Sequence, residues 1–213
     1  MTLLVPAHPG AASDLATFAK RVARYEPDAV VRIVAGGTVV GCFAETPFDA
    51  LALRAVQLAE PIETDIVVEA ATLAARAVGA RGELELPPAL PALRWTSSLP
   101  PRSGFTERAR LPVSEVVARV DQGVEEFRTR AVGVTEGLSL RAGRAALEGL
   151  ATEIWDVELA AGIPLRLAHA ASSYGFFGDG PGEVVLREAG AWWRLDAPHG
   201  SVLARGGLAL FAL

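Results

Sequence analysis

A proline-rich stretch over residues 87–103 divides this chain into two parts. It contains five prolines, and its order is Pro-Pro-Ala-Leu-Pro-Ala-Leu-Arg-Trp-Thr-Ser-Ser-Leu-Pro-Pro-Arg-Ser. Proline fixes φ and lacks a backbone N–H, so neither a helix nor a central strand can run through the stretch. Its leucines and tryptophan are apolar enough to pack, unlike a flexible Gly/Ser tether. We therefore predict an N-terminal segment (1–86), a packed connector (87–104) and a C-terminal segment (105–213).

The N-terminal segment begins with a pattern that is typical of a helix followed by strands. Ser13 or Asp14 can cap a helix that Pro27 ends. Two runs rich in β-branched residues then flank Gly36-Gly37, and this arrangement predicts a β-hairpin whose turn lies at the two glycines.

The pattern of residues 50–59, after this hairpin, fits both a strand and a helix. Residues 50–59 alternate as a strand would, but their leucines also fit helical spacing. We favour a strand because a hairpin precedes it. An alanine-rich helix ending near Gly79 and a short edge strand at 83–86 complete the segment.

The C-terminal segment starts with helices and ends with strands. Valines at helical spacing follow Pro112, a second helix starts near Ser139, and a third, rich in small residues, runs from Pro164 to Gly175. Three short strands joined by tight turns then predict an antiparallel meander over 183–205. The expected fold class is α+β, with no βαβ alternation.

Composition excludes several classes of protein. With 51% hydrophobic and 21% charged residues the chain is not disordered, and a net charge of −5 makes binding to nucleic acid an unfavoured role. The single cysteine, Cys42, excludes a disulfide framework and is expected to be a buried small hydrophobe. The three histidines show no ligand spacing, so we expect no metal and no cofactor. No membrane helix or secretory signal is evident, and we expect a cytoplasmic protein.

The best candidate for a polar site is the trio Arg194, Asp196 and His199. Arg194 and Asp196 are two apart on a strand and share a face, while His199 lies at the following turn. An aspartate that orients a histidine is how a general base is built, and an adjacent arginine can hold an anion. The alternative is a solvent-facing strand on which Asp196 pairs with Arg194 or Arg205.

Other polar residues are better explained by structure than by chemistry. His169 lies in the small-residue helix, where we expect it to be buried or simply exposed. The glycine-rich run Gly175–Gly182 is expected to be a helix C-cap and a turn, because it runs from helix to strand and lacks a lysine. Arg102, Arg108 and Arg110 form a basic cluster that we expect to be a solvated charged segment.

Two apolar features favour self-association. The last eight residues, 206–213, carry no charge, and an apolar tail needs to dock on its own domain or on another copy. Trp192 and Trp193 point to opposite faces of one strand, so that sheet is expected to be covered on both sides. We therefore expect a homo-oligomer, with a further protein partner as an open possibility.

Two strings, Leu51-Ala-Leu-Arg-Ala-Val and Trp193-Arg-Leu-Asp-Ala-Pro-His-Gly-Ser-Val-Leu-Ala-Arg205, resemble those of uncharacterised conserved two-part proteins of high-GC Gram-positive bacteria. This resemblance implies a bacterial cytoplasmic protein and supplies no catalytic residue. The sequence thus favours a non-catalytic interaction or scaffolding protein that acts as a homo-oligomer. The alternative is a small-molecule-binding protein or enzyme with its site near Arg194, Asp196 and His199, between the two halves.

Overall fold

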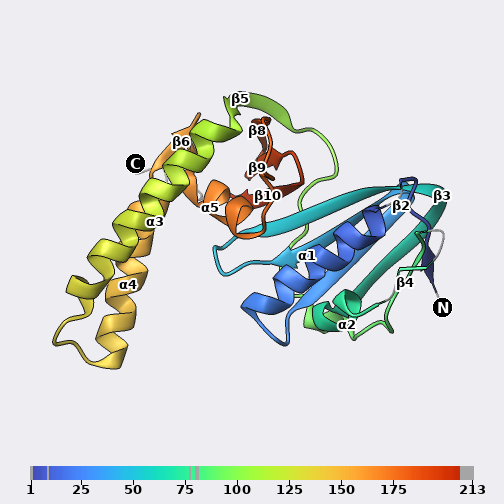
Figure 1. Ribbon diagram of the computed structural model, residues 1–213, viewed down its shortest axis with the longest axis horizontal. Helices are drawn as coiled ribbons and strands as arrows, with labels where there is room; N and C mark the ends of the chain where they lie inside the picture. The colour runs from blue at the N-terminus through green and yellow to red at the C-terminus, as the bar shows by residue number, and fades with distance from the viewer. Residues whose placement is uncertain (1, 9, 77, 80–81, 207–213) are drawn as a thin grey trace. The chain divides into compact units, whose positions relative to one another are not determined.

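The computed structural model describes residues 2–8, 10–76, 78–79 and 82–206. The chain divides into two compact units, an N-terminal unit (Met1–Pro100) and a C-terminal unit (Pro101–Leu213). Each unit combines helices with antiparallel strands (Figure 1), so the predicted α+β class is confirmed. The segment boundaries predicted at 86 and 104 stay a prediction. Over the described residues, no helix is both long enough and apolar enough to cross a membrane.

The N-terminal unit is built around one long hairpin and a helix that packs on it. Its elements are β1 (Leu3–Leu4), α1 (Ala11–Tyr25), β2 (Val30–Glu45), β3 (Leu51–Glu69), α2 (Ala70–Ala74), β4 (Leu84–Glu85) and a 3₁₀ turn (Ala92–Arg94). Strand β2 pairs with β3, and β1 with β4, both antiparallel. Residues 50–59 fall almost entirely within β3, so the strand interpretation is confirmed. The predicted alanine-rich helix is short and ends at Ala74 rather than near Gly79.

The hairpin turn does not lie at Gly36-Gly37, and that prediction was wrong. Strand β2 continues through both glycines, and the register with β3 shifts between Gly37 and Val39. Gly37 has φ +88°, which suits a β-bulge, and its N–H donates to Glu63 Oε1 at 3.1 Å. The chain instead reverses at 46–50, where the Thr46 hydroxyl donates to the Ala50 carbonyl at 2.9 Å.

Helix α1 buries one face against the rest of its unit (Figure 1). Its apolar stripe is fully covered and consists of Ala12, Leu15, Phe18, Ala19 and Val22. The helix begins earlier than predicted. Gly10 is the N-cap, so neither Ser13 nor Asp14 caps the helix. Asp14 lies in the first turn and pairs with Arg54 of β3 at 2.6 Å.

The first part of the proline-rich connector packs on the N-terminal unit. The Leu90 N–H donates to the Val67 carbonyl at 2.7 Å, and the Trp95 side chain is buried. Glu45 accepts from the Thr96 hydroxyl and from the Ser97 N–H at 3.0 and 2.9 Å. These contacts explain why a segment with so many prolines is still ordered.

The C-terminal unit has four strands that pair in the order β10-β9-β8-β5. Its elements are β5 (Thr106–Pro112), α3 (Val113–Thr135), α4 (Leu140–Trp155), β6 (Glu158–Ala160), β7 (Ile163–Pro164), α5 (Leu165–Ser173), β8 (Glu183–Ala189), β9 (Trp192–Ala197) and β10 (Gly200–Arg205). The meander of β8, β9 and β10 and the three helices occur where the sequence predicts them. Ser139 caps α4 through its side chain, which accepts from the Ala142 N–H at 3.4 Å.

Helix α5 is central to the C-terminal unit, and its small residues allow the neighbouring elements to approach closely. It contacts β9, β10 and α3, and Ala168, Ala170 and Ala171 are completely buried. The sheet face beneath it is apolar and comprises Val184, Leu186, Leu195 and Val202. Because side chains alternate along a strand, this arrangement places the intervening polar residues on the opposite face.

Candidate functional site: a charge ladder beside a glycine clasp

The opposite face of the sheet gathers charged residues from three strands. The register sets Glu107 of β5 against Arg187 of β8, and Arg187 against Arg194 of β9. Asp196 lies two residues further along β9, and its partner on β10 is Ser201. Residues distant in the chain therefore lie side by side on one surface.

Asp196 accepts hydrogen bonds from three side chains of this surface. Its Oδ1 accepts from Arg194 Nε at 2.7 Å and from the Ser201 hydroxyl at 2.5 Å. Its Oδ2 accepts from Arg187 Nε at 3.0 Å. Arg194 and Asp196 thus form an ion pair along the strand, on the face that they were predicted to share. Both carboxylate oxygens of Asp196 accept hydrogen bonds.

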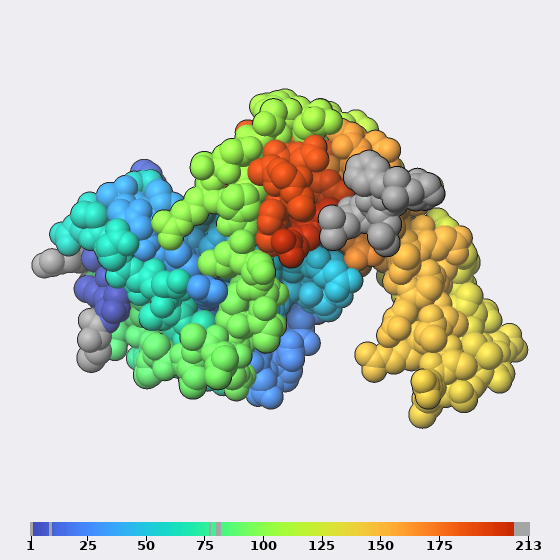
Figure 2. Space-filling model, turned by 180° about the vertical axis from the view of Figure 1, so that it is seen from behind, coloured from blue at the N-terminus to red at the C-terminus, as the bar shows by residue number. Residues whose placement is uncertain are grey.

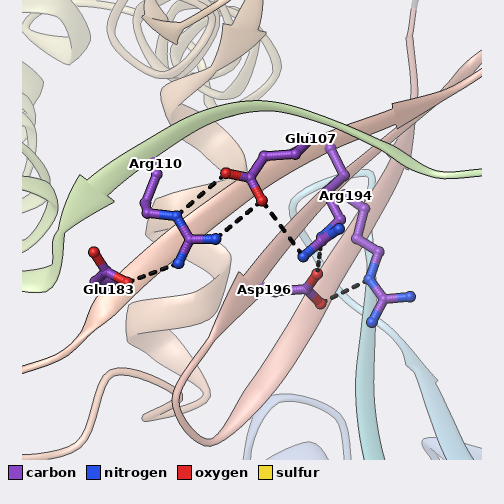
Figure 3. Close-up of polar contacts among 6 residues, drawn as sticks. Glu107, Arg110, Glu183, Arg194 and Asp196 are labelled. Atoms are coloured by element: carbon purple, nitrogen blue, oxygen red, sulfur yellow. Dashed lines mark hydrogen bonds and ion pairs between the residues drawn. The ribbon is translucent and has the colours of Figure 1, made fainter.

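The contacts continue across the sheet as a row of alternating charge (Figure 3). A second guanidinium nitrogen of Arg187 lies 3.8 Å from Glu107, which also accepts from Arg110 at 3.0 and 3.2 Å. Arg110 reaches Glu183 at 2.7 Å. The hydrogen bonds that Arg110 donates to Glu107, and then the one to Glu183, raise the pKa of its guanidinium. We call this row of six residues the charge ladder: Glu183, Arg110, Glu107, Arg187, Asp196 and Arg194.

The charge ladder is balanced, with three carboxylates and three guanidinium groups. Each arginine of the ladder contacts at least one acid of the ladder. A phosphate or carboxylate ligand would compete with carboxylates that these arginines already contact. Exposed pairs of this kind add little stability.

Aromatic rings border the ladder and the neighbouring strand end. The Arg194 guanidinium lies over the Phe105 ring at 5.5 Å, and that of Arg205 lies over Trp192 at 5.8 Å. Trp192 and Trp193 are each half-buried. Of the apolar tail predicted to dock, residues 207–213 lie outside the described part of the chain.

His199 lies in the β9–β10 turn, where it packs on the glycine-rich run. A Cβ built on Gly178 would come within 2.4 Å of His199 Nε2, so the imidazole occupies the space that a side chain would need. The His199 N–H donates to the Phe176 carbonyl at 2.9 Å. The contacts of Asp196 described above are with Arg187, Arg194 and Ser201, whereas the described contacts of His199 are with the loop that follows α5.

Two more glycines complete this interlocking, which we call the glycine clasp. A Cβ on Gly200 would come within 2.6 Å of the Phe176 ring, and one on Gly182 within 2.9 Å of Pro198. The clasp thus joins the run 175–182 to the turn 198–200 through three pairs: Gly178 with His199, Gly200 with Phe176, and Gly182 with Pro198. It gives the glycine-rich run a packing role in addition to its turns.

The start of this run also ends helix α5, as predicted. Gly175 has φ +65°, its N–H donates to the Ser172 carbonyl at 2.8 Å, and the Phe176 N–H donates to the Ala171 carbonyl at 2.9 Å. These two bonds and the left-handed glycine form a Schellman motif. The start of the run is therefore a helix C-cap.

The structure also places Cys42 and the basic cluster that the sequence analysis considered. Cys42 is completely buried, and this burial raises the pKa of its thiol to about 12. Arg108 and Arg110 belong to β5, which the sequence did not predict as a strand, while Arg102 lies before it. Among the described residues, no group of three or more His, Cys, Asp or Glu side chains could hold a metal ion.

His169 stacks on Trp155 of α4, with ring centroids 3.8 Å apart and an angle of 8° between the planes. Burial lowers the pKa of the imidazole to about 4, so it is neutral near pH 7. The ring contributes a flat surface to the junction of α4 and α5.

The lowered pKa of His169 predicts a specific loss of stability in acid. Between pH 6.5 and pH 4 the unfolded chain binds a proton that the folded protein does not, so stability falls as pH falls. His169→Phe keeps the stacking and removes the titration. Between pH 7.5 and pH 5 we expect the variant to lose less stability than the wild type, by on the order of 1 kcal/mol. Urea unfolding at both pH values measures this, and equal losses would contradict it.

Comparisons with known proteins now identify the family. Residues 100–209 match a family model described as a domain of unknown function, DUF8185. The chain belongs to the DUF8185 family. Residues 1–97 match a second model of a domain of unknown function, DUF8010. Two domain models thus cover this DUF8185 protein, in agreement with the two-part organisation that the resemblance implies. A comparison with curated proteins finds no match.

Solved structures similar to this DUF8185 protein are bacterial DNA sliding clamps. The sliding clamp (DNA polymerase III subunit beta) of Bartonella birtlesii, bound to griselimycin, has TM-score 0.55 at 13% identity, covering 96% of this chain and 65% of the clamp. The subunit beta of Caulobacter crescentus has TM-score 0.52 at 12% identity, covering 96% and 65%. The sliding clamp of Pseudomonas aeruginosa has TM-score 0.51 at 13% identity, covering 99% and 66%.

These identities show a shared fold alone. The chain spans about 65% of the length of the first of these clamps. The comparison therefore supports an α+β sliding-clamp-like fold.

The sequence did not predict most of the charge ladder. Arg194 and Asp196 were predicted as neighbours, but Glu107, Arg110 and Glu183 depend on β5, whose charged sequence did not look like a strand. Alternation along 106–110 was a weak signal for the strand. It does not predict that Glu107 and Arg110 share a face, because that depends on the register shift between Glu107 and Ala109.

Proposed function

We propose that this chain is a non-catalytic cytoplasmic interaction or scaffolding protein that acts as a homo-oligomer. The single observation that carries the proposal is the sliding-clamp fold over nearly the whole chain. The similar structures are named as subunit beta of DNA polymerase III, which is one subunit of a larger enzyme. By analogy with these subunits, we expect this chain to act through contacts with other protein chains.

The charge ladder supports the same proposal. Catalytic carboxylates and bases need a reacting group within hydrogen-bonding distance, and the oxygens of Asp196 are already bonded to Arg187, Arg194 and Ser201. The internal pairing of arginines and the net charge of −5 give no support for binding to a nucleic-acid backbone.

Thermal unfolding with a panel of metabolites, nucleotides and metal ions tests the non-catalytic part of this proposal. A ligand at about 100 times its Kd stabilises a protein by about 2.7 kcal/mol, enough to raise Tm by several degrees. We expect no reproducible shift with any chemical class at constant ionic strength. A shift that is lost in Asp196→Asn or His199→Ala would instead support the small-molecule site predicted from the sequence.

A further inference from the structure

Helices α3 and α4 form a hairpin, and few other elements of the unit pack against the half that lies farther from α5. In Figure 1 the two helices run side by side away from α5 and the sheet of their own unit, and Figure 2 shows the far end of the hairpin in yellow. The fully buried residues of α3 all lie in its first half, up to Gly123, where α5 is near. Beyond that point Val124 and Phe127 are only half-buried.

Large apolar side chains lie exposed at this end. Leu140 is 96% exposed, Val132 76% and Leu138 48%. Single exposed leucines are ordinary, but three such residues within nine positions at the end of one hairpin form a local apolar surface. Leu147, two turns after Leu140 on α4, lies on the same face of the helix and is half-buried.

The charges of α4 run against its own helix dipole. Acids near the first turn and bases near the last turn would be favourable, yet Arg141 and Arg144 lie at the start and Glu148 and Glu153 follow. The exposed pair of Arg144 with Glu148 at 3.1 Å also has the less favourable order for an i,i+4 pair. Glu153 is explained by its ion pair with Arg130 of α3 at 2.7 Å. The stability of the isolated helix does not account for the order of Arg144 and Glu148.

An antiparallel copy of the same helix does account for it. When two copies of α4 pack about a two-fold axis near Ala146 and Leu147, the basic half of each lies against the acidic half of the other. The two macrodipoles then oppose each other favourably, and because the copies run antiparallel, Leu147 lies near its equivalent while Leu140 of each copy lies near Ala151 of the other.

We propose that the outer face of α4 is a self-association surface whose occupant is the α4 helix of a second copy of this chain, packed antiparallel. The strip that makes this surface consists of Leu140, Arg144, Leu147, Glu148 and Ala151. This inference rests on the proposed homo-oligomer and names the surface that forms it.

Mass measurements by light scattering over a concentration series test the apolar part of the surface. Leu140→Asp is expected to raise the Kd of self-association about tenfold or more while the fold, followed by circular dichroism, stays unchanged. Leu93→Asp is the matched control, because Leu93 is 92% exposed but lies in the N-terminal unit, and it is expected to leave the Kd unchanged.

Charge reversal tests the antiparallel arrangement. One variant, Arg141→Glu with Arg144→Glu, has an all-acidic α4, and a second, Glu148→Arg, is mostly basic; Glu153 is kept because it bonds Arg130. Each variant alone is expected to self-associate about tenfold or more weakly than the wild type, and an equimolar mixture to regain the wild-type mass.

The outcomes separate this inference from the proposed function. If the wild type associates and these variants associate equally well, α4 is not the surface, although the homo-oligomer stands. If the wild type is a monomer throughout the series, the homo-oligomer fails and this surface fails with it.

Discussion

Replacing Gly200 with alanine is expected to lower the free energy of unfolding by about 1–3 kcal/mol, the usual cost of overpacking a filled core. The added Cβ would lie 2.6 Å from two ring atoms of Phe176, whose side chain is 2% exposed. Gly200 is not among the glycines with positive φ, so this cost comes from the contact and not from the backbone. Urea unfolding of Gly200→Ala against the wild type measures it.

Gly180 provides the matched control in the same run of glycines. A Cβ there would meet nothing within 4 Å, and the residue is exposed. Gly180→Ala is therefore expected to be neutral or slightly stabilising, because it restricts the unfolded chain. Adding Phe176→Leu to Gly200→Ala makes room for the new methyl group and is expected to lessen the clash. If Gly200→Ala behaves like Gly180→Ala, the glycine clasp does not contribute to stability.

Gly123→Ala is expected to destabilise the protein by about 1–2 kcal/mol even though alanine is the better helix former by about 1 kcal/mol. The new Cβ in α3 would lie 2.7 Å from Cζ3 and 2.9 Å from Cη2 of Trp155. Trp155 cannot simply move away, because His169 stacks on it at 3.8 Å. Chemical denaturation followed by tryptophan fluorescence measures the loss.

The control for Gly123 lies on α4. Gly149 is exposed within that helix, and a Cβ there would meet nothing within 4 Å. Gly149→Ala is expected to stabilise the protein by up to about 1 kcal/mol, since only helix propensity changes. A Gly123→Ala variant as stable as Gly149→Ala would show that α3 and α4 do not pack as closely as described.

Local patterns predicted the elements that their own residues define. Pro164, the small residues of α5 and Gly175 mark a helix from start to C-cap without help from the rest of the chain. Ser139 marks the start of α4 in the same way. The tight turns of the final meander were predicted because glycine and proline set backbone angles locally.

The hairpin turn in the N-terminal unit shows where local patterns fail. Two adjacent glycines between β-branched runs are typical of a turn, but they also suit a bulge, and Gly37 is in a bulge here. The turn at 46–50 uses Asp49 at φ +54° and the Thr46 hydroxyl. The position of the turn depends on the register in which β2 and β3 pair along their whole length. The local sequence does not show whether the chain reverses at the glycine pair or at Asp49.

The charge ladder and the glycine clasp were beyond prediction for a related reason. Glu107 and Asp196 belong to one network only because β5 pairs with β8 and β8 with β9. Phe176 and Gly200 meet only because the helix α5 returns the chain to the sheet. Such contacts join residues that are distant in the sequence, and no local spacing marks them.

The mass of the wild-type protein in solution tests the central proposal most directly. Light scattering across a micromolar concentration series should give a weight-average mass that rises to at least twice 22.3 kDa, because the chain is proposed to act as a homo-oligomer. A mass that stays at 22.3 kDa across the series would contradict the proposal.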